Sequence, residues 1–420
     1  MPRCRRFFLG RGQGTGGRVP PSASQGLKER SPLGGNLAVA AGASAAGSLA
    51  GYANLTGNTA QHAVLWYANT TKDLGTLGGK NSALLNQFSG FSESSTTDPL
   101  GQNYCGTGTN LICLPITATS GSAVQLPLLG GNNGAGFGNN DVGQVAGVAQ
   151  TTFQDPSCLV NGQPVKPFLQ VQQAVPVVWT NGNIRHLPLY AGDTEGSANA
   201  INNLGQATGA SGDCVNAPTA HGVVWINGQP VNLGNLGGSL NTNPFAINNL
   251  TQITGTSDVA GDKTSHAFLW QKGKMQDLGT LAGDTYSAGY SINDLGQIVG
   301  QSCNAANQCR AFLWQNGTMM DLNSLIPANS PLYLYFAGAI DEFGVIAGYA
   351  VDQSANNSPA FVAVPQLFGV NPTETSSVAH IRPAVPRVTM PVGVRAQMRP
   401  DLRTRGVQRT GMSPSLPPAR

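Results

Sequence analysis

A segment of about 45 residues recurs along this 420-residue chain, and the repeat constrains the fold more than any other feature. The clearest copy is residues 265–301, SHAFLWQKGKMQDLGTLAGDTYSAGYSINDLGQIVGQ. No stretch of it places apolar residues at helical spacing over about ten residues, which argues against a helical repeat. The repeat therefore predicts an all-β protein built from many similar units.

Each copy contains four predicted strands separated by turns. The strands are residues 266–270, 275–278, 286–292 and 297–301, with Lys272-Gly273 and Asn293-Asp294-Leu295-Gly296 typical of tight turns. The first strand, His-Ala-Phe-Leu-Trp, does not alternate between apolar and polar residues, so both of its faces should be covered. Four short strands make a unit the size of a propeller blade, whose sheet packs between two neighbours.

The tryptophan spacing gives the number of blades. Trp179, Trp225, Trp270 and Trp314 follow one another at 46, 45 and 44 residues, and Trp66 precedes them by two units plus insertions. Six whole units lie between a degenerate third and fourth strand at residues 36–53 and a lone first strand at residues 359–364. The second unit is the most eroded, with Ser122-Ala123-Val124 in place of the tryptophan strand. Because the two ends complement each other, we predict a β-propeller of seven four-stranded blades, the last shared between 36–53 and 359–364.

The residues that recur at matching positions of the copies are expected to have structural roles. They are Trp66, Trp179, Trp225, Trp270 and Trp314, the glycines Gly79, Gly131, Gly238 and Gly283 before the third strand, and the glycines Gly147, Gly209, Gly255, Gly300 and Gly348 of the fourth strand.

Charge is distributed unevenly. Residues 1–30 and 366–420 each carry a net +6, whereas residues 31–365 carry −9. The C-terminal part is rich in Pro and Arg and poor in large apolar residues, a composition typical of disorder. We expect a disordered basic extension at residues 1–35, a propeller domain at residues 36–365 and a disordered Arg/Pro-rich tail at residues 366–420. The basic tails lack interleaved aromatic residues, which argues against a nucleic-acid partner.

The N-terminus shows no signal peptide, and no run of about 18 apolar residues predicts a membrane span. A misassigned gene start or reading frame would explain the unusual tails, and it would also account for the missing signal peptide.

Three motifs recur in a fixed order, and together they resemble the HAF repeat family of extracellular bacterial proteins. The motifs are His-Ala-Phe-Leu-Trp at 266–270, Asp-Leu-Gly-Thr-Leu-Ala-Gly at 277–283 and Ile-Asn-x-x-Gly-Gln-x-x-Gly at 292–300. The resemblance covers roughly residues 36–365 and implies an exported protein, extracellular or periplasmic, of undetermined function. The missing signal peptide, the eroded second unit and the two tails depart from the family pattern.

Six of the seven cysteines fall in connections between the fourth strand of one unit and the first strand of the next, which share one face of a propeller. Such loops can simply tolerate cysteine, or they can hold three disulfides in an oxidising compartment. The disulfide hypothesis pairs Cys105 with Cys113, Cys303 with Cys309 and, between adjacent blades, Cys158 with Cys214. The sequence has no Cys-x-x-Cys pair with histidine partners, so a zinc site is not expected.

Histidines and acids that recur are better explained by structure than by catalysis. His62, His221 and His266 begin the tryptophan strand, but Pro176 and Arg310 occupy the same place, so this position should cap or orient the strand. Asp73, Asp277 and Asp321 alternate with Asn232, as expected for a turn cap. Asp193-Thr194-Glu195 is too short for a calcium loop, and His186 and His380 have no evident partner. The acids and bases that do not recur are interpreted as surface residues: Glu93, Asp155, Arg185, Glu195 and Glu342.

The sequence thus favours a secreted, non-catalytic propeller that binds a glycan or a surface protein, rimmed by the loop at 94–119 and the insertion at 149–175. It indicates no catalytic, cofactor-binding or metal-binding residue and no cofactor. The alternative is a polysaccharide hydrolase or lyase with unique acids converging at the propeller axis, and a third interpretation is a structural surface protein that assembles with its own copies.

Overall fold

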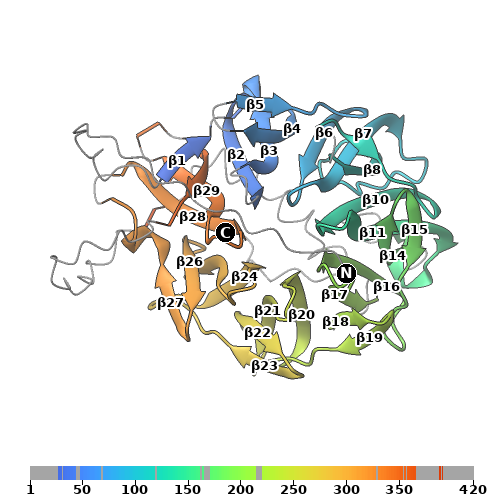
Figure 1. Cartoon of the computed structure of the whole chain (residues 1–420). Helices are drawn as coiled ribbons and strands as arrows, with labels where there is room; N and C mark the ends of the chain where they lie inside the picture. The colour runs from blue at the N-terminus through green and yellow to red at the C-terminus, as the bar shows by residue number, and fades with distance from the viewer. Residues whose placement is uncertain are drawn as a thin grey trace, which may run out of the picture.

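The computed structural model describes residues 27–30, 32–43, 48–67, 70–118, 121–160, 163–164, 171–213, 220–327, 330–352, 354–355, 357–365, 387–388 and 390. Over these residues the protein is a seven-bladed β-propeller in which each blade is a four-stranded antiparallel sheet (Figure 1). The predicted fold class is confirmed, including a last blade shared between the two ends of the chain.

The blades follow one another along the chain, and each is given from its innermost to its outermost strand. Blade 1 is β2 (Gly34–Ala43), β3 (Leu49–Leu55), β4 (Gln61–Tyr67) and β5 (Thr70–Asp73); blade 2 is β6 (Gly78–Leu84), β7 (Ser89–Thr97), β8 (Leu111–Thr117) and β9 (Val124–Gln125). Blade 3 is β10 (Gly130–Asn139), β11 (Gln144–Gln154), β14 (Gln172–Thr180) and β15 (Asn183–His186); blade 4 is β16 (Glu195–Ile201), β17 (Ala207–Gly212), β18 (His221–Ile226) and β19 (Gln229–Asn232).

Blade 5 is β20 (Gly237–Ile247), β21 (Ile253–Val259), β22 (Ser265–Gln271) and β23 (Lys274–Asp277); blade 6 is β24 (Tyr286–Ile292), β25 (Ile298–Cys303), β26 (Cys309–Gln315) and β27 (Thr318–Asp321); blade 7 is β28 (Leu332–Ile340), β29 (Ile346–Asp352), β30 (Ala360–Ala363) and β1 (Leu27–Arg30). A two-stranded hairpin, β12 (Leu159–Val160) and β13 (Gln163–Pro164), and three short 3-10 turns, η1 (Thr56–Asn58), η2 (Pro156–Cys158) and η3 (Leu322–Ser324), complete the elements of the described residues. None of these helical turns is long and apolar enough to cross a membrane.

The blades are out of phase with the sequence repeat, so two predictions about the strands were wrong. The tryptophan strand is the third strand of its blade, and residues 36–53 belong with it in blade 1. Blade 7 is instead completed by β1, which pairs with β30 from Leu27↔Ala363 to Arg30↔Ala360, so the domain starts before residue 36. In blade 2 the third strand is β8, and Val124 belongs to the outer strand β9. A cyclic repeat fits any starting point, and β1 and β8 carry no repeat signature.

The third strand of each blade is buried because it packs between two neighbouring sheets. Trp66, Trp179 and Trp225 are each 1% exposed, and Trp270 and Trp314 are also buried. The indole nitrogens of Trp179 and Trp225 donate to the carbonyls of Pro127 and Pro188 in the preceding blade, at 2.8 and 2.7 Å. The structural role predicted for the tryptophans therefore consists of joining adjacent blades.

The recurring glycines of the second strand lie where no side chain fits. A Cβ at Gly209, Gly300 or Gly348 would overlap a carbonyl oxygen of the innermost strand. In register, Gly209 is opposite Ala198, Gly300 opposite Gly289 and Gly348 opposite Ala337, and in each case the inner strand skips its next residue. The glycine thus allows a β-bulge in the inner strand.

The recurring glycines at the start of the inner strands have a second kind of close contact. A Cβ at Gly79, Gly131 or Gly238 would crowd both the backbone and the Cβ of the neighbouring strand at Glu93, Gln150 or Asp258. Gly283 differs, because its backbone has φ of +80° and the space around it is more open.

The turns between first and second strands join blade to blade through asparagine side chains. Asn248 Nδ2 donates to Gln252 Oε1 of its own turn at 2.7 Å and to the carbonyl of Asn293 in the next blade at 2.9 Å. The same contact links Asn140 to Asn202, Asn202 to Asn248 and Asn293 to Asp341. The Asn-x-x-Gly-Gln motif therefore builds a continuous chain of hydrogen bonds from blade 3 to blade 7.

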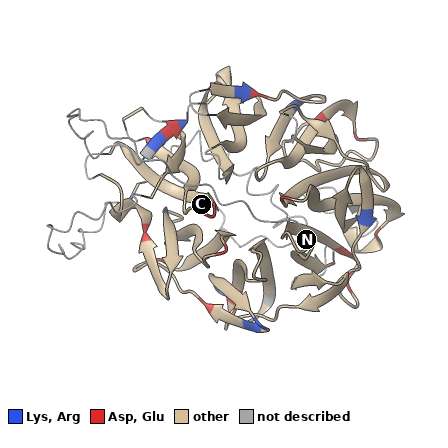
Figure 2. Ribbon diagram, viewed as in Figure 1, with Lys and Arg blue, Asp and Glu red and all other residues tan. Residues whose placement is uncertain are grey.

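Charged residues are few and scattered over the propeller, and β1 stands out as a charged strand at the outer edge of blade 7 (Figure 2). Polar and charged outer strands protect a sheet edge from pairing with another chain. The disorder expected for residues 1–26 and for most of residues 366–420 falls outside the described residues. Arg387, Val388 and Met390 are described, and they pack against the propeller.

Candidate functional site at the propeller axis

The two faces of the propeller differ in chemistry. We call the face with the first-to-second strand turns the asparagine face, because it carries the linked turns described above. The opposite face carries the second-to-third strand connections, which hold the cysteines, and we call it the disulfide face.

A cavity of about 250 Å³ opens at the axis on the asparagine face. Every blade contributes to its wall through the last residues of its innermost strand or those that follow it. The lining residues are 41–43, 85–87, 137–139, 199–201, 245–247, 290–292 and 338–340.

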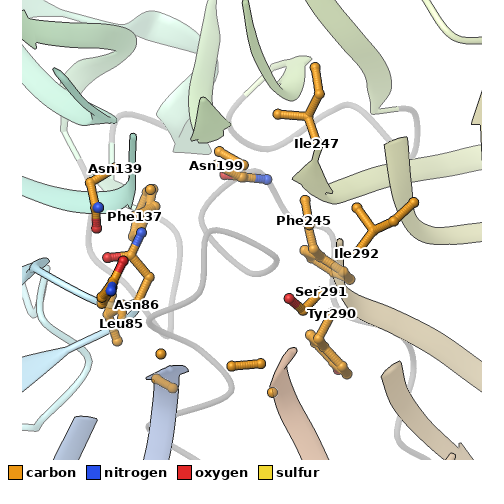
Figure 3. A pocket seen from close by; sticks show the side chains of 18 of the residues that line it. Leu85, Asn86, Phe137, Asn139, Asn199, Phe245, Ile247, Tyr290, Ser291 and Ile292 are labelled. Atoms are coloured by element: carbon orange, nitrogen blue, oxygen red, sulfur yellow. The ribbon is translucent and has the colours of Figure 1, made fainter. Parts of the chain in front are cut away.

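The bulges of the inner strands point side chains into this cavity. The residues skipped by the strand pairing are Ala41, Phe137, Asn199, Phe245, Tyr290 and Gly338. All of them line the cavity, and Figure 3 shows Phe137 with Leu85 and Asn86 facing Phe245 and Tyr290 across the opening. A bulge commonly re-aims a side chain in this way. Because these positions differ from blade to blade, they give the cavity its specific surface.

The cavity wall combines apolar side chains with uncharged polar groups. Asn86 and Asn139 use their Oδ1 atoms to accept from the backbone N–H of Phe88, at 3.1 and 3.0 Å. Ser291 Oγ accepts from Ile340 N at 3.2 Å. Within the described part of the chain, the Nδ2 groups of both asparagines and the Ser291 hydroxyl proton remain available to a ligand.

None of the described residues that line the cavity is acidic or basic. The alternative function, a polysaccharide hydrolase or lyase, required acids gathered at the axis, and the described lining of this cavity supplies none. The acids near the axis instead lie in the strand turns, where Asp294 for example accepts from the backbone and side chain of Asn249 at 2.8 and 2.9 Å.

Aromatic rings continue from the cavity into the interior. Tyr290 stacks on Phe245 with ring centroids 5.0 Å apart and contacts Phe336 at 4.8 Å, and Phe336 stacks on Tyr349 at 5.1 Å. Burial, and then neighbouring Tyr290, raise the pKa of Tyr286 well above its ordinary value. A set of packed aromatic rings thus extends from Phe245 and Tyr290 in the cavity wall to Phe336 and Tyr349 in blade 7.

Exposed apolar side chains surround the cavity at the tips of the linked turns. Each of five consecutive blades presents one of them, between 62% and 72% exposed, and we call this set the crown: Val142, Leu204, Leu250, Leu295 and Phe343. A repeated exposed apolar position around an opening is typical of a contact surface.

The disulfide face confirms the cysteine predictions as far as the described residues extend. Cys105 is bonded to Cys113, and Cys303 to Cys309. Cys158 is also disulfide-bonded, and Cys214, with which we expect it to pair, lies outside the described residues. The loop at 94–119 and the insertion at 149–175 join second to third strands and therefore lie on this face, away from the axial cavity.

Three acids predicted to be surface residues are buried on the disulfide side. Glu93, Asp155 and Glu195 are 0%, 1% and 1% exposed, whereas Arg185 and Glu342 are exposed as expected. Glu93 Oε2 accepts from Asn81 N and Nδ2 at 2.9 and 3.0 Å, and the hydroxyl of Thr109 donates to its other oxygen at 2.6 Å. Loops distant in sequence supply such partners, so the local pattern could not reveal the burial.

Asp155, Cys158 and Glu195 come together with ligand atoms within 4.8 Å of one another. This group does not form a metal site, because the disulfide of Cys158 leaves no thiolate to bind an ion. Glu195 Oε1 instead accepts from the backbone of Ala174 at 3.2 Å.

The recurring histidines and aspartates hold the outer strands. His62 contacts Asp73 at 2.9 Å, and His266 contacts Asp277 at 3.0 Å. Asp73 and Asn232 each accept from a backbone N–H two residues on, at 2.8 Å, which confirms the turn cap. In blade 4, where Asn232 takes the place of the aspartate, His221 contacts Asp193 at 3.1 Å. His186 is exposed, and His380 lies outside the described residues.

No family model matches the chain, and no curated protein matches it. Among solved structures 73 chains match. The β-propeller domain of the Trilobed protease from Pyrococcus furiosus has a TM-score of 0.43 and 9% identity, over 66% of this chain and 77% of that one. A puromycin-hydrolyzing peptidase from Mycobacterium tuberculosis has a TM-score of 0.46 and 11% identity, over 79% and 56%. The acylaminoacyl peptidase from Pyrococcus horikoshii has 0.42 and 11%, over 72% and 48%.

The chain spans about half the length of the last two proteins. At these identities the likeness is one of fold alone. The expectation of a purely non-catalytic module for a glycan or a protein is corrected, because the solved structures that match include an acylaminoacyl peptidase, a prolyl endopeptidase and a puromycin hydrolase.

Proposed function

We propose that the protein is a peptidase-related propeller whose axial cavity receives an uncharged segment of a peptide chain, with the catalytic groups on a separate unit. The observation that carries the proposal is the cavity wall, which combines apolar side chains, unused amide and hydroxyl donors, and no charge. The likeness to the peptidases named above serves only to choose peptide hydrolysis as the reaction to test.

A peptide segment fits this wall group by group. Its carbonyl oxygens can accept from Asn86 Nδ2, Asn139 Nδ2 and the Ser291 hydroxyl, while its apolar side chains contact Phe137 and Phe245. A charged ligand would lose its hydration without gaining an opposite charge, and that loss is costly. The cavity therefore favours neutral segments over charged ones.

The size of the cavity limits how much of a peptide enters. Pockets for drug-sized ligands are about 300–1,000 Å³, and this cavity is about 250 Å³. A short segment would occupy it, while the flanking residues would extend over the rim.

The crown supports the second part of the proposal. Its five exposed apolar side chains lie on five of the seven blades, and a separate catalytic unit seated on them would be held over the bound segment. The described residues of the cavity wall include no acid, base or histidine, so hydrolysis would need groups from that unit.

Two disulfides in the described chain fit an oxidising compartment. Extracellular or periplasmic localisation and membership in the HAF repeat family both stay proposals.

The test measures the binding of acetyl-Ala-Leu-Ala-amide to the full chain by ligand-detected NMR. We expect Asn139→Leu and Asn86→Leu each to weaken binding by about tenfold, which corresponds to the loss of one hydrogen bond. Asn183→Leu, an equivalent change on the exposed outer strand β15, should leave binding unchanged. Thermal unfolding of each variant verifies that the fold is retained.

Equal binding of acetyl-Ala-Glu-Ala-amide would show that the cavity does not select neutral segments and would refute the proposal. Cleavage of the neutral peptide by the chain alone would disprove the separate catalytic unit.

A further inference from the structure

The disulfide face holds a short piece of the C-terminal region. Arg387 Nη1 donates to the carbonyl of Gln308 and Nη2 to the carbonyl of Gly283, both at 3.2 Å. Gly283 lies between β23 and β24, and Gln308 between β25 and β26, so both belong to connections of this face. The Cys303–Cys309 disulfide closes the loop that presents Gln308. Arg387 therefore occupies a position prepared by two separate connections.

The carboxylate of Asp284 supplies the charge for this position. Its side chain is 0% exposed, and Oδ1 lies 2.5 Å from Arg387 Nη1, an ion pair rather than an aligned hydrogen bond. Its other oxygen accepts from Arg310 Nη2 at 2.8 Å, and Arg310 Nη1 contacts Asp321 at 3.1 Å. Burial alone would lower the pKa of Arg310, but the hydrogen bonds and charges of Asp284 and Asp321 together outweigh it and raise this pKa.

Without Arg387, the charged groups of this position would be the carboxylates of Asp284 and Asp321 and the guanidinium of Arg310. A net negative charge would then remain in a mostly buried place, which is costly unless a cation enters. The position of Arg387 offers one carboxylate and two carbonyl oxygens. This set of acceptors suits the planar donors of arginine better than the ammonium of lysine.

An apolar position follows three residues later. Met390 is 7% exposed and belongs to the axial hydrophobic cluster that includes Tyr333 and Tyr335, and Val388 packs against the same cluster. Tyr333 is 1% exposed, and its hydroxyl has no partner among the described residues. Burial, and then the charge of Asp321, raise the pKa of Tyr333 above its ordinary value. The position for the cation and the position for the apolar side chain together match a segment of the form Arg-x-x-Met.

We propose that the disulfide face carries a binding site for a short peptide segment with an arginine followed three residues later by methionine or a similar flexible apolar residue. Arg387 and Met390 occupy this site as an internal ligand, and such a segment of a partner protein displaces them. The inference does not rest on the proposed function, because it concerns the opposite face and different residues.

The tethered segment and a peptide in solution compete for the same site, so the tethered segment controls access to it. A tethered segment acts at an effective concentration on the order of millimolar, so a free peptide at micromolar concentration does not displace it. Weakening the internal ligand by two substitutions should open the site to a peptide added from solution.

The experiment uses full-length chains and a fluorescent peptide with the sequence of residues 385–392, VPRVTMPV, with binding followed by fluorescence anisotropy. We expect the Arg387→Ala/Met390→Ala chain to bind this peptide at least about tenfold more tightly than the wild-type chain. Adding Asp284→Asn to that chain should remove the gain. A peptide with Arg387→Lys should bind the opened chain more weakly, and one with Arg387→Ala and Met390→Ala should not bind.

Equal binding to wild-type and opened chains would overturn the internal-ligand assignment. Absence of binding to an opened chain whose thermal unfolding matches the wild type would overturn the site. The lysine peptide guards against misfolding of the Asp284→Asn chain, because it tests the same contact on an unchanged protein; if it binds as well as the arginine peptide, the proposed recognition is wrong. None of these measurements involves the neutral tripeptides or the asparagine face, so failure here leaves the axial cavity untested.

Discussion

At the scale of single residues, the same amino acid is required for different physical reasons at different places. Gly300 lies opposite the bulge of β24, where a Cβ would overlap the carbonyl oxygen of Ala288. Gly273 lies in the tight turn between β22 and β23, with φ of +77° and open space around it. The first glycine is needed because no atom fits, and the second because of its backbone conformation.

These two reasons predict different costs for the same substitution. Gly300→Ala should lower the free energy of unfolding by about 3 kcal/mol or more, since a clash with backbone cannot be relieved by a rotamer change. Gly273→Ala should cost only about 1 kcal/mol, the penalty of a left-handed conformation. Urea unfolding of both variants measures the difference. Equal losses of free energy would mean that the bulge can relax and that the close contact of Gly300 with the Ala288 carbonyl does not constrain the strand.

The cavity residues also show what a single sequence can and cannot reveal at this scale. Turn caps such as Asp73 and the loop disulfides follow from local patterns, and both were predicted. Phe245 and Tyr290 look like ordinary strand residues in the sequence, and only the skipped register of β20 and β24 places them at the axis. A bulge depends on the pairing of two strands, and its one sequence signal, the glycine opposite, was interpreted only as structural.

At the scale of elements, the turns between first and second strands hold neighbouring blades together. Asn248 is 4% exposed; its Oδ1 accepts from Leu250 N and Gln252 N, and its Nδ2 reaches the next blade. Asn249, the next residue, is only half-buried and bonds Asp294. The motif therefore contains one buried asparagine that serves two blades and one peripheral residue that adds to the contact.

The difference between the two asparagines can be measured. Asn248→Ala should lower the free energy of unfolding by about 2–4 kcal/mol, because it leaves buried backbone groups of two blades without partners. Asn249→Ala, the matched control in the same turn, should cost about 1 kcal/mol. Thermal unfolding monitored by circular dichroism compares them. If Asn249→Ala proved the more damaging, the turns would be joined mainly through their exposed residues.

The strand content of each unit was predictable because turn residues and apolar runs are local signals. The grouping of strands into blades was not, since a repeat of four strands can be divided at any strand boundary. The choice depends on hydrogen bonds between segments such as β3 and β4, which pair from Leu49↔Trp66 to Asn54↔Gln61.

At the scale of the whole molecule, the ring is closed by a strand without any repeat character. β1 has the sequence Leu-Lys-Glu-Arg, and it pairs along its full length with β30. A propeller needs its last sheet completed, and here backbone pairing alone suffices, so the outer position accepts charged side chains that keep other chains away. The sequence could indicate that the two ends share a blade, but not which N-terminal residues contribute.

Closure by β1 predicts a specific effect of truncation. A chain lacking residues 1–30 should unfold at lower denaturant than a chain lacking residues 1–26, with a loss of about 2–3 kcal/mol from the missing strand hydrogen bonds. Hydrogen exchange should then show faster exchange at β30 than at β22, whose blade is unchanged, because β30 becomes the open edge of blade 7. If both truncated chains were equally stable and β30 exchanged as before, ring closure would depend on the packing of β28 against blades 1 and 6, and the pairing with β1 would contribute no stability.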